Sequence, residues 1–230
     1  EPNDAPRRPT EKQRNAKKPL ESTLEAIAFW DDWNEKAGGR EVLSSDDMAK
    51  LDSMQAAVAG NPFAAALLEG CTHKETTFRT GETQFNVALQ CRPDGYSATG
   101  ADVSAGVPYN IDLKSTADMD RFLKQFHDFG YYRQSPFYRT VQATVNGMTD
   151  GQCPEPQRFF YIAVESVEPF GCTVFEADPL SLKIGLDEVM EDLEKMRRCV
   201  ADNIWPNAPE QATAGLPEWR VSKLLDEEGA

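Results

Sequence analysis

The sequence predicts an α/β fold in which a mixed central sheet is flanked by helices. Apolar residues recur at helical spacing over the first third of the chain, alternate with polar residues from about residue 75, and mark a long helix near the end. Helices and strands in this order are typical of layered domains in which helices cover a sheet. The 230 residues, 40% of them hydrophobic, are enough for one sizeable core.

Three helices are expected before the sheet. The first should start at a capping box at residues 22–25 and end at Gly38, the second should span about 45–60, and the third about 61–69. Their apolar stripes are expected to face the core. These stripes comprise Ile27, Trp30 and Trp33 in the first helix, and Met48, Leu51, Met54 and Val58 in the second.

The sheet should begin with a hairpin whose turn is at Gly81 and Glu82, because apolar and polar residues alternate from Phe85 to Cys91. Pro93 should end that strand. Further strands are expected at 109–114, 159–165 and 172–175, a helical stretch broken near Gly130 at 117–145, and a long amphipathic helix at 182–200.

The charge is unevenly distributed. The chain has 24 basic and 38 acidic residues, a net charge of −14, which is unfavourable for a protein that binds DNA. Residues 1–20 nevertheless carry an excess of Lys and Arg and are rich in Pro, so they could contact phosphates or simply be solvated. We therefore expect a basic flexible arm at 1–20 and a single domain at 21–230.

Composition also bears on location. The chain has no run of 18 apolar residues, so no membrane span is expected. Its five cysteines are an odd number at wide spacings without a CxxC pair, which argues against a disulfide framework and a zinc ribbon. A cytoplasmic location is therefore expected.

The residues with the clearest chemical meaning are Asp94 and the segment Asp112-Leu113-Lys114. Residues two apart on a strand share a face, so Asp112 and Lys114 should point together while Ile111 and Leu113 face the core. If the hairpin brings Asp94 alongside, two carboxylates and the Leu113 carbonyl could hold Mg²⁺. Taken alone, an Asp-x-Lys strand is more often a solvent-exposed face.

Further motifs fall in order around these residues. They are residues 67–70 with Glu75, 91–95, 111–116, 129–138 and 161–165. Together they resemble the successive motifs of RecE-like (exodeoxyribonuclease VIII) nucleases in the RecB-like branch of the PD-(D/E)XK superfamily, over about residues 20–200. The resemblance implies a restriction-endonuclease-like core.

The resemblance also implies roles for individual residues. Asp94 and Asp112 would be metal ligands, Lys114 the catalytic lysine and Glu75 the acid of the first motif. Gln134 and Tyr138 match the QxxxY motif, which helps to hold the nucleic acid and the catalytic strand. Arg92 is expected to support DNA binding.

The implied activity is Mg²⁺-dependent hydrolysis of linear double-stranded DNA from its ends, 5′ to 3′, leaving 3′ single strands for recombination. Mn²⁺ is expected to substitute for Mg²⁺. The resemblance further implies a homo-oligomer, a tetrameric ring, and a partner annealing protein of the RecT type. Arg92, Lys114 and the basic arm would line the channel of such a ring.

Two features depart from the family pattern. Pro136 lies between Gln134 and Tyr138, so the helix should kink or begin near it. The family places a histidine in an N-terminal helix near the metal, and no plausible match to it precedes Glu75. Two alternatives therefore stay open: a catalytically silent DNA-binding or assembly module with the same fold, and another RecB-like nuclease such as the iron–sulfur type of CRISPR adaptation.

Overall fold

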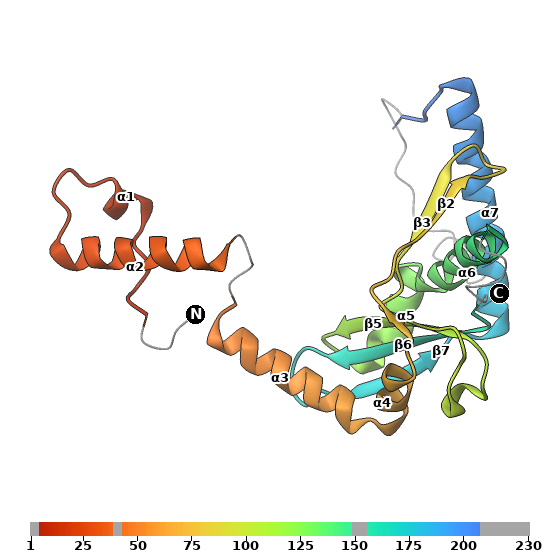
Figure 1. Ribbon diagram of the computed structural model, residues 1–230, viewed down its shortest axis with the longest axis horizontal. Helices are drawn as coiled ribbons and strands as arrows, with labels where there is room; N and C mark the ends of the chain where they lie inside the picture. The colour runs from red at the N-terminus through yellow and green to blue at the C-terminus, as the bar shows by residue number, and fades with distance from the viewer. Residues whose placement is uncertain (1–4, 39–42, 149–155, 208–230) are drawn as a thin grey trace, which may run out of the picture.

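Two parallel strands, β5 (Tyr109–Thr116) and β6 (Arg158–Glu165), form the centre of a mixed sheet. The computed structural model describes residues 5–38, 43–148 and 156–207. β7 (Cys172–Glu176) pairs antiparallel with β6, and β4 (Gly95–Ser97) with β5, while the short β1 (His73–Lys74) lies outside β4. The expected α/β fold, a mixed sheet flanked by helices, is confirmed (Figure 1).

Alternation along the central strands separates the two faces of the sheet. On β6, Phe160 and Ile162 face α4 (Pro62–Glu69), while Phe159, Tyr161 and Ala163 face α5 (Phe122–Asp128) and α6 (Tyr131–Met148). The strand is buried from its second to its seventh residue, which is typical of a parallel strand covered on both faces. Short 3₁₀ turns at Asp102–Ser104 and Met119–Arg121 flank β5.

The second helix layer is a pair formed by α6 and α7 (Pro179–Asp202). Val189 and Leu193 of α7 pack with Val141 of α6 against a separate hairpin, β2 (Phe78–Glu82) and β3 (Ala88–Cys91). The expected break in the helical stretch is confirmed, because Gly130, with φ 66°, separates α5 from α6. This layer covers the face of the sheet that carries Asp112.

The hairpin turn lies later than expected. Gly81 and Glu82 belong to β2, and Glu82 pairs with Ala88, so the turn comprises residues 83–87. Phe85 is buried in the turn rather than paired in a strand, and Asn86 takes the left-handed conformation with φ 59°. The Thr83 hydroxyl closes the loop by donating to the Val87 carbonyl at 2.8 Å. The position of the turn therefore follows the burial of Phe85 and not the preference of Gly81 for turns.

The N-terminal helices are placed largely as expected. α3 (Ser45–Gly60) is capped by Ser44, and α4 is capped by Asn61, whose Oδ1 accepts from the Phe63 and Ala64 amides at 3.1 and 3.0 Å. The Asn61 side-chain amide also donates to the Cys172 carbonyl of β7 at 3.0 Å, which ties α4 to the sheet.

The apolar stripe of α3 is not core, contrary to expectation. Met48 and Leu51 are exposed and no residue of α3 is fully buried. Only the C-terminal end of the helix reaches the sheet, where Val58 packs near Ile162. Figure 1 shows α3 running away from the sheet towards α2 (Glu21–Ala37).

The arm folds onto α2. α1 (Glu11–Arg14) precedes it, the Trp30 indole donates to the Pro6 carbonyl at 2.8 Å, and the Arg8 guanidinium lies 4.1 Å from the Trp30 ring centre. Trp30 is thus buried by the arm and not by the sheet. The expected capping box at 22–25 is wrong, because Leu20 already has the extended backbone of an N-cap and places Ser22 inside the first turn.

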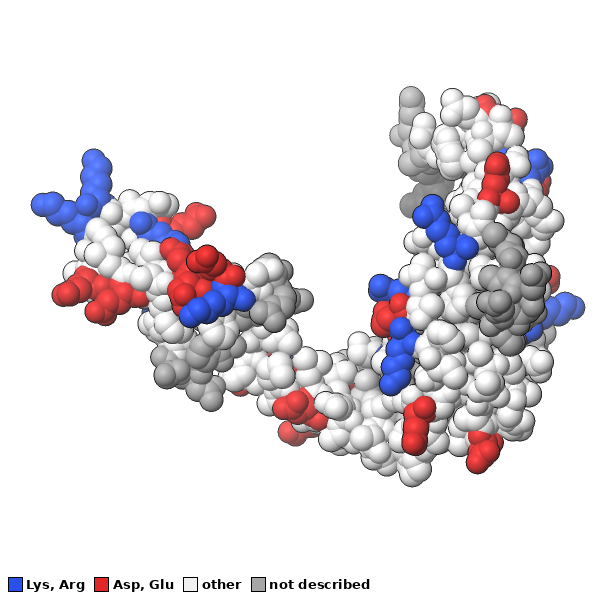
Figure 2. Space-filling model, in the orientation of Figure 1, with Lys and Arg blue, Asp and Glu red and all other residues white. Residues whose placement is uncertain are grey.

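Charges are not spread evenly over the surface. Figure 2 shows Lys and Arg side chains along the margin of the sheet-bearing part that faces α2, with acidic residues among them. Within the described ranges, no helix is long and apolar enough to cross a membrane.

Candidate active site

Asp94 reaches the middle of β5 because β4 pairs antiparallel with it. Gly95 lies opposite Ile111, so the preceding residue comes beside Asp112 and Leu113. The Leu113 amide donates to Asp94 Oδ2 at 2.5 Å. The hairpin and β4 therefore bring Asp94 alongside the Asp-x-Lys segment.

Asp112 and Lys114 share the face of β5 that α6 covers. Their side chains are only 7% and 16% exposed, and the Lys114 ammonium contacts Asp112 Oδ2. The same ammonium lies 4.3 Å from the centre of the Tyr131 ring, close enough for a cation–π contact. The pair is therefore a buried ion pair and not a solvent-exposed face.

Leu113 does not face the core as expected. Its residue is 45% exposed, whereas Ile111, two residues earlier on the same side, is fully buried. Ile111 packs with Ala64 and Leu67 of α4, and this cover does not extend to Leu113. The strand end is thus open on one face, so the Leu113 backbone lies near solvent.

The electrostatic environment of Asp112 is unusual. Burial raises the pKa of this carboxyl, and the nearby Asp94 charge raises it further. Contacts with Lys114 and Gln134 oppose the rise, but the pKa stays above its ordinary value. A carboxylate held in this environment would gain from a bound cation.

α6 is aligned on β5 by a stripe of polar residues. Gln134 Nε2 donates to Asp112 Oδ1 at 2.6 Å and lies 3.2 Å from the Tyr138 hydroxyl. Gln142, one helical turn after Tyr138, forms two buried hydrogen bonds with Asn110, of 2.7 and 3.1 Å. The helix therefore runs antiparallel to the strand, in a register set by these contacts.

Pro136 does not disrupt this arrangement. α6 begins at Tyr131, five residues before the proline, and continues through it. Gln134 and Tyr138 remain on one face of the helix, as their contact shows.

Glu75 and Arg92 lie at the edge of the site and contact each other. Arg92 Nε is 3.1 Å from Glu75 Oε2, and both side chains are more than half exposed. The Glu75 amide donates to the Asp94 carbonyl at 3.2 Å, but its backbone is left-handed with φ 51°. The structure thus places Glu75 next to the Asp94 backbone, with its carboxylate directed to Arg92.

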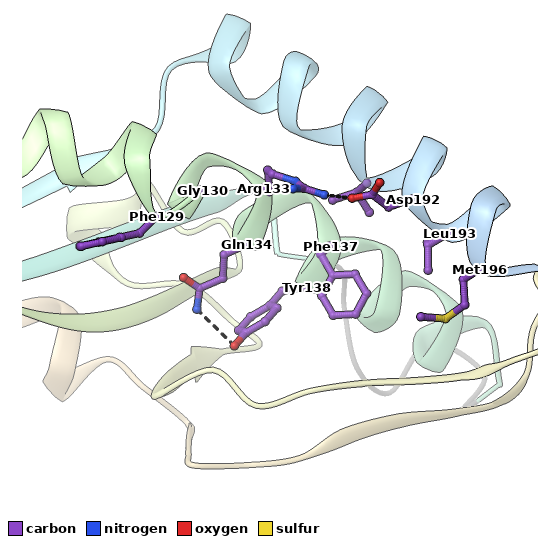
Figure 3. A pocket seen from close by; sticks show the side chains of 10 residues that line it. Phe129, Gly130, Arg133, Gln134, Phe137, Tyr138, Asp192, Leu193 and Met196 are labelled. Carbon is purple, nitrogen blue, oxygen red and sulfur yellow. Dashed lines mark hydrogen bonds and ion pairs between the residues drawn. The ribbon is translucent and has the colours of Figure 1, made fainter. Parts of the chain in front are cut away.

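A pocket adjoins these residues between α6 and α7. It has a volume of about 350 Å³ and is lined by Phe129, Gly130, Arg133, Gln134, Phe137, Tyr138, Val189, Asp192, Leu193 and Met196. Figure 3 shows Gln134 and Tyr138 on its α6 wall. Gln134 therefore lines the pocket and also touches the candidate catalytic carboxylate.

Three residues of this site were not predicted from the sequence. Tyr131 lies under the Lys114 ammonium, and Tyr161 supports it by donating to the Tyr131 carbonyl at 2.7 Å. Gln142 anchors the far end of α6. Gln142 could have been found, because it continues the Gln134–Tyr138 spacing of four residues.

The donor set fits a hard divalent cation. Carboxylate oxygens of Asp94 and Asp112 and the Leu113 carbonyl are the oxygen ligands that Mg²⁺ prefers, and Mg²⁺ commonly takes one or two carboxylates and keeps several waters. The described residues contain no cluster of three or more His, Cys, Asp or Glu side chains. Asp94 and Asp112, which lie beside each other at β5, would be the side chains that hold such an ion.

Comparisons with known proteins found a similar solved structure and a matching family. The chain resembles the crystal structure of a presumed exonuclease from Eubacterium rectale, with 14% sequence identity and a TM-score of 0.48, over 82% of this chain and 72% of that one. No curated protein matches the sequence. Residues 17–214 match the family described as PDDEXK-like domain of unknown function (DUF3799). The chain belongs to this PDDEXK-like family.

Proposed function

We propose that this protein is a Mg²⁺-dependent DNA exonuclease that hydrolyses phosphodiester bonds of linear double-stranded DNA, with Mn²⁺ able to replace Mg²⁺. The observation that carries the proposal is the environment of Asp112. Its buried carboxylate touches both the Lys114 ammonium and the Gln134 amide, and Asp94 lies beside it, immediately before β4. Membership of the PDDEXK-like family supports the same chemistry.

Each residue has a defined task in this reaction. A divalent cation bound by Asp94, Asp112 and the Leu113 carbonyl would supply Lewis-acid activation of water and of the scissile phosphate. Lys114, held between Asp112 and the Tyr131 ring, would orient the attacking water and offset negative charge that develops on the phosphate. Gln134 holds the Asp112 carboxylate in place, while Arg92 at the rim would contact the DNA backbone.

Polarity and assembly rest on the RecE-like resemblance. It supports digestion from the 5′ end, 3′ single strands for recombination, a tetrameric ring and a RecT-type annealing partner. The cations along the margin that faces α2 would help an acidic chain to approach DNA (Figure 2).

A gel assay tests the proposal. Linear duplexes labelled at the 5′ or 3′ end and a closed circular duplex would be incubated with the protein in Mg²⁺ or EDTA. We expect Mg²⁺-dependent loss of the linear DNA, early release of the 5′ label and survival of the circle. The Lys114→Ala variant should lower the rate by several orders of magnitude while keeping its circular dichroism spectrum.

The two alternatives predict other results. A catalytically silent module would bind linear DNA without degrading it in Mg²⁺ or Mn²⁺. An iron–sulfur nuclease would need clustered cysteines, and the described Cys71, Cys91, Cys172 and Cys199 form no such cluster. An absorbance spectrum of the purified protein without a brown chromophore would count against the iron–sulfur type.

A further inference from the structure

We propose that the pocket between α6 and α7 is a nucleobase subsite, which takes one unpaired base of the DNA strand that is held for cleavage. The inference rests on the proposed nuclease function and adds to it a binding site that stacks a base. Three observations carry it: the position of the pocket, the chemistry of its lining and the exposure of Phe129.

Gln134 connects the pocket to the candidate metal ligands. Gln134 lies on the pocket wall, and its amide donates to Asp112 Oδ1 at 2.6 Å. Tyr138, one turn further along α6, lines the same wall (Figure 3). A nucleotide whose phosphate lies at Asp112 would therefore have its base within reach of this cavity.

The lining suits the flat face of a base. Phe129, Phe137 and Tyr138 supply aromatic rings, and Leu193 and Met196 of α7 close the opposite wall. Aromatic side chains stack on unpaired bases of any sequence, and each such contact contributes about 1–3 kcal/mol. A volume of about 350 Å³ lies within the range that proteins use for small organic ligands, so one base with its sugar is a reasonable occupant.

The charged residues at the rim are compatible with a nucleic acid. Asp192, the acid among the lining residues, contacts Arg133 and lies 3.3 Å from the Lys195 ammonium. Lys195 and Arg133, which also lies 3.4 Å from Glu188, therefore offset the negative charge of Asp192. An apolar pocket accepts a base more readily when the carboxylate at its rim is paired with cations than when that carboxylate is unpaired.

Phe129 is the residue that a packing role explains least. It follows the last residue of α5, its surface is 65% exposed, and Figure 3 shows it at the margin of the pocket, with its ring directed away from Phe137 and Tyr138. Leu123, on α5 itself, is 66% exposed but does not line the pocket. The two positions form a matched pair, since substitution at either should leave the fold intact.

A linear duplex can supply an unpaired base at its end. Taking a base out of the stack requires less energy where the base is already unpaired. Occupation of the subsite would thus favour frayed ends over the interior of a duplex. It would also fix the position of the terminal phosphate relative to Asp112.

The test compares binding to a fluorescein-labelled oligothymidine with binding to an abasic strand of the same length, by fluorescence anisotropy with Ca²⁺ in place of Mg²⁺. Wild-type protein should bind the thymidine strand more tightly. Phe129→Ala should weaken that binding by about 5–150-fold, the range for loss of one stacked base, and Met196→Gln should weaken it as well. Both variants should leave abasic binding unchanged. Leu123→Ala should change neither.

Several outcomes would overturn the subsite. These are equal binding of the two strands by the wild type, no binding of either strand, equal losses for both strands in Phe129→Ala, or the same loss in Leu123→Ala. The result is independent of hydrolysis. A protein that cleaves DNA but shows no base preference keeps the nuclease function without the subsite, and one that shows the preference without cleavage loses only the nuclease function.

Discussion

Gln134 Nε2 lies 2.6 Å from Asp112 Oδ1, which joins the centre of the candidate active site to the wall of the neighbouring pocket. Because α6 runs antiparallel to β5, the same helix face also carries Gln142 to its buried partner Asn110. The position of the Asp112 carboxylate therefore depends on how α6 packs.

We first predict that Gln134→Ala lowers the rate of DNA hydrolysis by about 10–100-fold, the usual effect of losing a hydrogen-bond partner of a metal ligand. Part of the loss should appear as a higher Mg²⁺ requirement, because the amide touches Asp112 directly. Titration of the rate with Mg²⁺ measures both effects. Tyr138→Phe, which removes only the hydroxyl near Gln134, is the control and should change the Mg²⁺ requirement little. A normal rate in Gln134→Ala would contradict the arrangement.

Asp112→Asn should abolish activity and change how the stability of the metal-free protein depends on pH. Burial raises the pKa of Asp112 above the value it has in the unfolded chain. The folded state therefore binds this proton more readily, so the contribution of Asp112 to stability is greatest in acid and falls as pH rises through the raised pKa. Asparagine has no such dependence.

Thermal unfolding in EDTA at several pH values measures this difference. The melting temperature of Asp112→Asn relative to wild type should increase as the pH rises from about the ordinary aspartate pKa of 3.9 towards neutrality. A constant difference across that range would show that Asp112 does not titrate abnormally.

A third prediction concerns which acids hold the metal. Mg²⁺ should raise the melting temperature of the wild type, since a ligand that binds only the folded state stabilises it. Asp94→Asn and Asp112→Asn should each lose this shift. Glu75→Gln should retain it, because the Glu75 carboxylate lies 3.1 Å from Arg92 Nε. Loss of the shift in Glu75→Gln would place Glu75 in the metal shell, as the RecE-like resemblance implies.

A fourth prediction concerns assembly and the arm. Light scattering after size exclusion should give the mass of a homo-oligomer at micromolar concentration, and a monomer that cuts circles as readily as linear DNA would contradict the ring.

Deleting residues 1–18 would expose Trp30, which packs on Pro6 and Arg8. The better variant therefore replaces Lys12, Lys17 and Lys18 by Gln. It should reduce processivity and make DNA affinity less steeply dependent on salt.

Much of this fold follows from local patterns. Alternation predicted that Asp112 and Lys114 share one face of β5, and the cap at Asn61 predicted the start of α4. These features depend on neighbours in sequence. The exposure of Leu113 and of the α3 stripe cannot be predicted from neighbours in sequence. It depends on where α4 and the sheet end in space.

The site itself was only partly predictable for the same reason. Gln134 was expected to support the active site, but its contact with Asp112 requires the register between α6 and β5. The pocket joins Phe129 to Met196, residues far apart in sequence, so no local pattern could indicate it. The direction of the Glu75 side chain depends on a left-handed backbone that is uncommon for glutamate.

The last prediction tests how closely α7 must approach α6. Gly185 of α7 packs against the backbone of Tyr132 and Arg133, and a Cβ at this position would collide with the Tyr132 carbonyl oxygen. Pro136 cannot donate to that carbonyl, so α7 meets α6 at the turn that the proline leaves without its usual hydrogen bond. Gly185→Ala should therefore destabilise the protein by about 1–3 kcal/mol, the range for overpacking.

Gly147→Ala is the matched control. Gly147 is also helical, and a Cβ there meets nothing within 4 Å, so alanine should stabilise the protein by about 0.4–1 kcal/mol. Urea unfolding of both variants measures these changes. Since displacement of α7 would move Arg133 and the adjoining Gln134, Gly185→Ala should also slow hydrolysis at a temperature where it remains folded. Equal stability in the two variants would show that the α6–α7 contact is looser than the structure indicates.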